Sequence, residues 1–249
     1  MLRIFLLSLL AATNVLAYSQ QADPAPAGNL PCATPIAKKT LSDWADLSRY
    51  KLDNDALGLP APGEKRVIFF GSSTTDNWGR EFGSVFFPGE PYVNRGISGE
   101  TSPQMLLRFQ QDVVALKPAA VVFLGGTNDV AGNSGPMTLE MTEANIQAMA
   151  TIAEAHGIKM ILASQLPVKE FPWNKCVHPE SNLLALTAWE REFAAAEHLG
   201  YVDYYSALLG SDGSFRPGLS PDGVHPNKKG YEVMAPVVVE VIRKILKIG

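Results

Sequence analysis

Short, wholly apolar runs that alternate with helical patterns constrain the fold of this chain most. Three such runs occupy residues 67–70, 121–124 and 160–163, and a weaker one occupies residues 201–204. Runs of this length are typical of strands that are buried on both faces of a sheet. Because helical segments separate the runs, crossover connections must join the strands, and these favour a mainly parallel sheet with helices on both faces. The sequence therefore predicts an α/β fold.

The helical segments between and around these runs have recognisable ends. Thr40 is predicted to cap a first helix that buries Trp44 and Leu47, and Ser102 is predicted to cap a second. Gly157 marks the C-terminal end of a third helix, since glycine is common just past a helix. The three longest predicted helices span residues 138–156, 181–199 and 231–248.

The composition excludes several classes of protein. Of the 249 residues, 46% are apolar and 18% are charged, which excludes a disordered chain. The net charge of −4 argues against a nucleic-acid partner, because such binding needs a basic surface. Two cysteines are too few for a structural zinc site, and zinc-protease and nucleotide-binding motifs are absent from the sequence. We therefore expect no metal and no organic cofactor.

The N-terminal residues are typical of an export signal. Arg3 precedes a short apolar run, and Ala17 provides a small residue for cleavage. The run is shorter than the roughly 20 apolar residues that a membrane-spanning helix needs. We expect residues 1–17 to be a signal peptide cleaved after Ala17, and the protein to be secreted or periplasmic without membrane insertion. Residues 18–39 are predicted to be a flexible leader, and residues 40–249 a single domain.

Export bears on the two cysteines, Cys32 and Cys176. Outside the cytoplasm these residues can form a disulfide that ties the N-terminal arm to a distant loop. The alternative is two unpaired thiols, because the sequence does not show the geometry that a disulfide requires.

Four polar turns that contain glycine follow predicted strands or precede the last helix. They occupy residues 71–76, 94–99, 125–129 and 220–227. In open parallel sheets, ligands bind beyond the carboxyl ends of the strands. We therefore expect these four turns to meet at one edge of the sheet and to form the functional site.

The turns contain the groups that acyl transfer requires. A serine hydroxyl is a poor nucleophile until a base removes its proton, and His225 is a suitable base because imidazole titrates near neutral pH. Asp222 is placed to accept the other ring N–H of the histidine. The negatively charged oxygen of a tetrahedral intermediate needs hydrogen-bond donors. The backbone N–H groups of Ser73 and Gly96 and the side-chain amide of Asn128 are the candidate donors.

These segments together resemble the SGNH, or GDSL-type, hydrolases, and they occur in the order of that family. The matching segments are Gly71-Ser72-Ser73, Gly96, Gly126-Thr127-Asn128-Asp129 and Asp222-Gly223-Val224-His225. The resemblance covers residues 40–249 and is strongest to the branch of platelet-activating-factor acetylhydrolase catalytic subunits and secreted bacterial GDSL-type esterases.

The resemblance carries expectations for both the fold and the site. It implies a flavodoxin-like three-layer α/β/α sandwich of about five parallel strands. It also implies that Ser73 is the nucleophile, that Asp222 and His225 complete a triad, and that Gly96 and Asn128 contribute to the oxyanion hole.

One position departs from the family pattern. The family usually has aspartate before the nucleophilic serine, whereas this chain has Ser72. In the family that aspartate mainly supports the loop, so we expect weaker ordering of the loop and no loss of chemistry. The change also makes Ser72 a rival nucleophile, although the alignment of the segment favours Ser73.

The sequence thus predicts a serine esterase that hydrolyses short acyl esters. The preferred substrates are expected to be acetyl esters of carbohydrate or of other small soluble compounds. The alternatives are a lysophospholipase or other lipid or thioester acyl hydrolase, and a non-catalytic module that binds acylated glycans. Trp173 and His178 lie in a loop that is predicted to contact the substrate. Asp129 is predicted to organise its loop, and Arg95 and Glu100 to pair with each other or with solvent.

Overall fold

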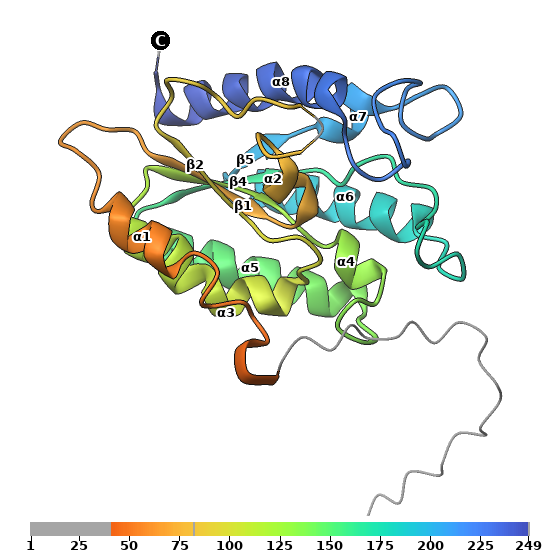
Figure 1. Cartoon of the computed structure of the whole chain (residues 1–249), viewed down its shortest axis with the longest axis horizontal. Coiled ribbons are helices and arrows are strands. Elements are labelled where there is room, and N and C mark those ends of the chain that lie inside the picture. Colours follow the sequence, from red (N-terminus) through yellow and green to blue (C-terminus); the bar gives the residue numbers. More distant parts are fainter. Residues whose placement is uncertain (1–40, 82, 249) are drawn as a thin grey trace, which may run out of the picture. The chain divides into compact units, whose positions relative to one another are not determined.

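The computed structural model describes residues 41–81 and 83–248. Its centre is a sheet of five strands in the order β2-β1-β3-β4-β5, and all four neighbouring pairs are parallel (Figure 1). The strands are β1 (Val67–Gly71), β2 (Tyr92–Gly96), β3 (Ala120–Leu124), β4 (Lys159–Ala163) and β5 (Gly200–Val202). This strand order is that of flavodoxin-like folds. The predicted parallel five-strand sheet is confirmed.

Helices connect the strands and precede or follow the sheet. The α-helices are α1 (Lys51–Leu57), α2 (Ser73–Asn77), α3 (Ser102–Asp112), α4 (Thr127–Val130), α5 (Leu139–Ala155), α6 (Glu180–Ala196), α7 (Tyr204–Leu208) and α8 (Lys228–Leu246). Two short 3-10 helices are η1 (Leu41–Asp43) and η2 (Val114–Leu116).

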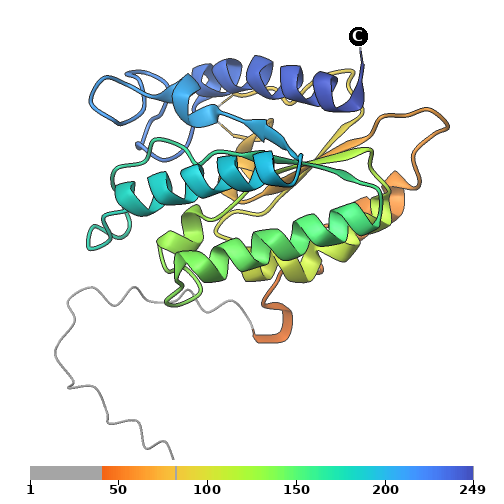
Figure 2. The ribbon, with the colours of Figure 1, turned by 180° about the vertical axis from the view of Figure 1, so that it is seen from behind.

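The sheet separates two hydrophobic clusters, because successive side chains of a strand point to opposite faces. Phe69 lies in one cluster with Met234 of α8, and Phe70 lies in the other with Phe109 of α3 and Met149 of α5. Figure 1 shows α7 and α8 on one side of the sheet and α3 and α5 on the other. Helix α6 packs into the same cluster as α5 and is visible from behind in Figure 2. The predicted three-layer α/β/α sandwich is confirmed.

The helix predicted after Thr40 is wrong within the described residues, and Thr40 itself lies outside them. Helix α1 starts only at Lys51, after a 3-10 turn and further turns. The carboxylate of Asp43 accepts the backbone N–H groups of Leu47 (2.7 Å) and Ser48 (3.0 Å). Such local side-chain bonds compete with the bonds of a helix. Trp44 is consequently 37% exposed and does not enter the core.

The longer helices were predicted with small errors at their ends. Thr101, rather than Ser102, caps α3, and its backbone N–H donates to the Gln104 side chain at 3.0 Å in a capping box. Helix α5 ends before Gly157, whose φ of +70° suits glycine, as predicted. Helix α8 begins at Lys228, capped by the Asn227 side chain, and ends at Leu246, so both of its ends lie before the predicted bounds of 231–248.

The predictions for the N-terminal residues are not tested by the structure. The signal peptide (residues 1–17), the leader (residues 18–39) and Cys32 all lie outside the described residues. Within residues 41–81 and 83–248, no helix has both the length and the apolar character needed to cross a bilayer.

Candidate active site

Three predicted residues lie in one hydrogen-bonded row at the carboxyl edge of the sheet. His225 Nε2 is 2.9 Å from Ser73 Oγ, and His225 Nδ1 is 2.7 Å from Asp222 Oδ2. Ser73 is the first residue of α2, directly beyond the end of β1, and the other two lie in the loop before α8. The row has the arrangement in which a carboxylate orients an imidazole and the imidazole deprotonates a serine.

The loop before α8 holds Asp222 in a fixed orientation. Asp222 Oδ1 accepts the backbone N–H groups of Val224 (2.9 Å) and His225 (2.8 Å). Gly223 adopts a φ of +77°, which glycine tolerates without strain, and its N–H donates to Ser220 Oγ at 2.9 Å. These bonds leave Asp222 Oδ2 directed at the ring of His225.

The charge of Asp222 follows from its surroundings. Partial burial raises the pKa of its carboxyl, but the hydrogen bonds from the His225 ring and from the His225 and Val224 backbone outweigh burial, and the pKa lies below its ordinary value. Asp222 is therefore a carboxylate at neutral pH and only accepts hydrogen bonds. This makes His225 Nδ1 the donor and leaves Nε2 of the neutral ring free to accept the Ser73 proton.

A contact between α8 and α2 explains why two distant segments meet. The hydroxyl of Tyr231, in the first turn of α8, donates to the Thr74 carbonyl at 2.8 Å. Tyr231 is almost fully buried and also contacts Trp78, with the ring centroids 4.9 Å apart. Packing of this tyrosine thus fixes the start of α8 beside α2 and brings His225 to Ser73.

The geometry separates Ser73 from its rival Ser72. Ser72 precedes α2 as its N-cap residue, and its carbonyl accepts the N–H of Asp76 at 2.9 Å. Its side chain is buried, whereas the Ser73 hydroxyl contacts the histidine. The base therefore faces Ser73 and not Ser72.

Asn128 lies beside Ser73 as predicted for an oxyanion donor. Its Nδ2 donates to the Glu100 carbonyl at 2.8 Å, and its Oδ1 accepts from Asn133 Nδ2 at 3.0 Å. These two bonds fix the orientation of the amide, and the second hydrogen on Nδ2 has no acceptor among the residues that the structure describes. Asn128 and Ser73 line the same pocket. Asn133, which sequence reasoning missed, thus positions the candidate donor.

Gly96 does not match its predicted role. It is the buried last residue of β2, and its N–H donates to Asn94 Oδ1 at 2.9 Å. A Cβ at this position would lie 2.1 Å from the backbone nitrogen of Asp76, so glycine is needed for the close approach of β2 to α2. The Gly96 N–H is already engaged, and the assignment of Gly96 to the oxyanion hole is corrected.

Gly99 is the better-placed glycine of this segment. It is exposed in the loop after β2 with a φ of +81°, and its N–H donates to no acceptor within the described part of the chain. Its carbonyl accepts from Asn133 Nδ2 at 3.4 Å, so it lies next to Asn128. The sequence alone does not separate the two glycines, because only the structure shows that β2 ends at Gly96 and that Gly99 lies beyond it.

A small pocket opens beside Ser73. Its volume is about 10 Å³, and its lining includes Leu124, Thr127, Leu166, Trp173 and Val224. The Trp173 ring is 44% exposed and stacks on His225, with the centroids 6.4 Å apart and an interplanar angle of 30°. Trp173 is therefore at the site, as predicted.

The other residue of the predicted substrate loop is placed differently. His178 is exposed and is not part of the pocket lining. Cys176, in the same loop, is disulfide-bonded. The pairing with Cys32 stays a prediction because Cys32 lies outside the described residues.

Buried ionic groups support the loops of the site. Arg108, with no exposed surface, donates to Glu100 at 2.5 Å, to the Arg95 carbonyl at 2.9 Å and to the Gly71 carbonyl at 3.1 Å. It thereby joins the ends of β1 and β2. Arg95 and Glu100 do not follow the expectation that they pair with each other or with solvent. Both are buried, and Arg95 Nε donates to Asn54 at 2.7 Å, whereas Glu100 accepts from Arg108.

Asp129 holds the loop after β3 against two helices. It accepts the backbone N–H of Ser102 at 3.0 Å, the Ser102 hydroxyl and the Thr142 hydroxyl at 3.3 Å. Burial raises the pKa of Asp129 to about 6, against the lowering effect of these bonds. These contacts match the predicted role of Asp129 as a loop organiser.

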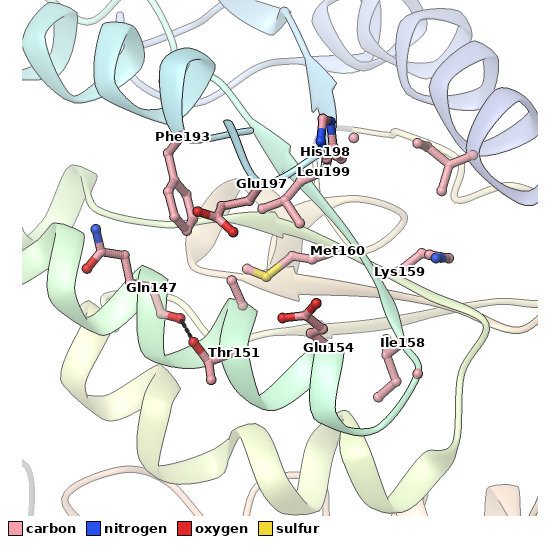
Figure 3. A pocket seen from close by; sticks show the side chains of 14 residues that line it. Gln147, Thr151, Glu154, Ile158, Lys159, Met160, Phe193, Glu197, His198 and Leu199 are labelled. Atoms are coloured by element: carbon pink, nitrogen blue, oxygen red, sulfur yellow. Dashed lines mark hydrogen bonds between the residues drawn. The ribbon is translucent and has the colours of Figure 1, made fainter. Parts of the chain in front are cut away.

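A second pocket lies at the opposite edge of the sheet, near the starts of β4 and β5. It has a volume of about 630 Å³, and Figure 3 shows the Met160 side chain between the side chains of Glu197 and of Glu154 of α5. None of the predicted site residues lines it. Among the residues that the structure describes, no cluster of His, Cys, Asp and Glu could hold a metal ion.

The fold and the site together define the class of this protein. Residues 63–233 match the model of the GDSL-like lipase/acylhydrolase family, and the chain belongs to that family of carboxylic ester hydrolases. The relationship stated from the sequence motifs is thereby confirmed.

Three individual proteins show how similar this chain is to known members of the family and to known esterases. A GDSL-like lipase from Bacteroides thetaiotaomicron, known as a crystal structure, is 41% identical and superposes with a TM-score of 0.77 over 80% of this chain and 98% of that chain. An acetylxylan esterase from Xylanibacter ruminicola is 26% identical over 77% of this chain and 46% of the esterase. Esterase TesA from Pseudomonas aeruginosa is 31% identical over 54% of this chain and 60% of TesA. This chain thus spans about half the length of these two esterases.

Proposed function

We propose that this protein is a serine esterase that removes short acyl groups, acetyl first of all, from carbohydrate or other hydroxylated soluble substrates. The observation that carries the proposal is the row Ser73–His225–Asp222, with distances of 2.9 and 2.7 Å between the interacting atoms. This arrangement also favours catalysis over the alternative of a module that only binds acylated glycans.

The mechanism follows from the hydrogen bonds of the row. Ser73 Oγ attacks the ester carbonyl while His225 Nε2 takes its proton, and Asp222 stabilises the resulting imidazolium. His225 then returns the proton to the leaving alcohol, and an acyl group remains on Ser73. Water, deprotonated by the same imidazole, releases the acyl group as a carboxylic acid.

The tetrahedral intermediate needs donors for its oxyanion. The N–H of Ser73, the unused hydrogen of Asn128 Nδ2 and the N–H of Gly99 are the groups that we assign to it. Each preorganised donor of this kind raises the rate by a factor on the order of 10²–10³.

The pocket beside Ser73 supports a preference for a short acyl group. The narrow space beside Ser73 leaves little room for a long acyl chain. Leu124, Leu166 and Val224 give it an apolar wall that suits the methyl of an acetyl ester. The acetylxylan esterase among the relatives agrees with this preference. A lipid substrate would need a longer apolar groove for its chain.

We also propose that the protein acts outside the cytoplasm. Residues 1–17 carry the composition of a signal peptide, and Cys176 is disulfide-bonded, which suits an oxidising compartment.

A substrate panel tests the proposed activity. The kcat/KM values of 4-nitrophenyl esters with two to twelve acyl carbons would be compared with those of acetylated xylo-oligosaccharides, with a fluorophosphonate label to detect the nucleophile. We expect labelling at Ser73 and the highest kcat/KM values for acetyl esters. Preference for the longest chains would favour a lipid hydrolase, and no labelling or turnover by folded protein would favour a binding module.

A further inference from the structure

We propose that the Thr127 hydroxyl oxygen accepts a hydrogen bond from a free hydroxyl of the substrate that lies close to the scissile ester. The inference deepens the proposed function, on which it rests, and defines the substrate class as esters of hydroxylated compounds. Thr127 is half-buried, lines the pocket beside Ser73 and precedes Asn128 directly in the chain.

A buried amide behind Thr127 determines which way its proton points. Gln165 has no exposed surface, and its Nε2 donates to the Gly125 carbonyl at 2.7 Å and to Glu190 Oε1 at 2.7 Å. A carbonyl oxygen can only accept hydrogen bonds, so the nitrogen of the amide must face Gly125. The oxygen of the same amide must then face Thr127, whose Oγ1 lies 2.9 Å away.

The single proton of the Thr127 hydroxyl is therefore committed to Gln165. The oxygen keeps lone pairs that can accept a hydrogen bond from the pocket, but it has no proton to donate there. A substrate hydroxyl can donate a hydrogen bond to this oxygen. An ether or ester oxygen in the same place has no proton to donate, and the lone pairs of the two oxygens would repel each other. Such a site rejects an analogue that lacks the hydroxyl.

The remaining contacts keep this arrangement rigid. The Gln165 backbone N–H donates to the Thr187 hydroxyl of α6 at 3.1 Å, and Glu190 on the same helix is fully buried. Burial raises the pKa of Glu190 well above its ordinary value. The Glu190 carboxyl and the Thr187 hydroxyl thus hold the side chain and the backbone of Gln165 in place.

Paired substrates test the inference. The first pair is a monoacetylated methyl xyloside with a free neighbouring hydroxyl and its analogue in which that hydroxyl is O-methylated. The second pair carries the hydroxyl on the acyl side, as 4-nitrophenyl glycolate and 4-nitrophenyl methoxyacetate. The readout is the ratio of kcat/KM values within each pair, for the wild type and for T127V and T127S.

We expect the wild type to prefer the free hydroxyl in one pair by on the order of 10-fold. T127V, which has the same shape without the hydroxyl, should bring that ratio close to one. T127S keeps a hydroxyl and should show a ratio close to that of the wild type. The pair that responds identifies whether the hydroxyl belongs to the alcohol or to the acyl group.

Two outcomes would overturn the inference. One is a wild type that does not discriminate within either pair, a measurement that requires no variant to fold. The other is a T127V variant that keeps the wild-type ratio. Failure of the proposed function itself is recognised separately, because the wild type would then hydrolyse none of these esters and would not react with a fluorophosphonate.

Discussion

His225 Nε2 lies 2.9 Å from Ser73 Oγ, although 152 residues separate the two along the chain. The nearby bond from Tyr231 to the Thr74 carbonyl holds the start of α8 against α2. The distance between the base and the nucleophile therefore depends on the docking of the last helix. Four expectations follow from this arrangement and from the groups around it.

Replacement of Ser73 separates the two candidate nucleophiles. S73A should lower kcat/KM for 4-nitrophenyl acetate by about three orders of magnitude or more, because no other described hydroxyl contacts His225. S72A is the matched control and should keep most of the activity. Circular dichroism would show that both variants fold. An active S73A together with an inactive S72A would contradict the assignment.

Removal of the Asn128 amide should lower kcat much more than it weakens substrate binding. N128A is expected to lower kcat by about 10²–10³, with a much smaller change in KM, because the donor acts on charge that develops in the transition state. N133A should cause a smaller loss, since Asn133 only positions the amide of Asn128. Steady-state kinetics on an acetyl ester measures both, and a change confined to KM would argue against the oxyanion role.

The two glycines after β2 should differ in what they contribute to stability. G96A should lower the free energy of unfolding by about 3 kcal/mol, because the new Cβ would lie 2.1 Å from backbone nitrogen. G99A meets no atom within 4 Å and should cost only about 1 kcal/mol, for a φ of +81°. Urea denaturation compares the variants. Equal costs would show that the close approach at Gly96 is not rigid.

Glu190 should make the stability of the protein depend on pH. Burial raises its pKa in the folded state well above the ordinary value of 4.5. Below that value both states hold the proton, and above it the unfolded chain releases a proton that the folded protein keeps. The free energy of unfolding should therefore fall as pH rises, by up to about 1.4 kcal/mol per pH unit until the folded-state pKa is reached.

The variant E190Q is neutral at every pH and should lack this fall. The difference in unfolding free energy between E190Q and wild type should grow from pH 4.5 towards pH 8, as measured by urea denaturation. The control is E192Q, an exposed residue of the same helix, which should follow the wild type. A difference that stays constant with pH would show that Glu190 is ionised in the folded protein.

Local patterns were enough to predict most of the fold. The runs in β1, β3 and β4 are apolar throughout because both faces of the sheet are covered, so tertiary packing and local pattern agree there. The segment before α1 shows the opposite case. Trp44 and Leu47 have helical spacing, but the Asp43 carboxylate binds backbone N–H groups in a turn instead.

The catalytic residues of the candidate site were predicted from the sequence, but the groups that surround and support them were predicted only in part. Motif resemblance selected Ser73, Asp222 and His225, and the structure brings these three residues together. Spacing alone did not separate Gly96 from Gly99, because the distinction depends on where β2 ends and on which N–H is already bonded. Arg108 was missed since its partners, Glu100 and the carbonyls of Gly71 and Arg95, are distant in sequence or ordinary backbone.

The amino-acid sequence by itself determined the order of strands and helices and the types of side chain available for chemistry, because periodicity and turn composition are local properties. Only the tertiary structure decided which glycine N–H remains available, which serine the histidine meets and where the Thr127 proton points. Each of these depends on hydrogen bonds between segments far apart in the chain, and hydrogen bonds act only over a few ångströms.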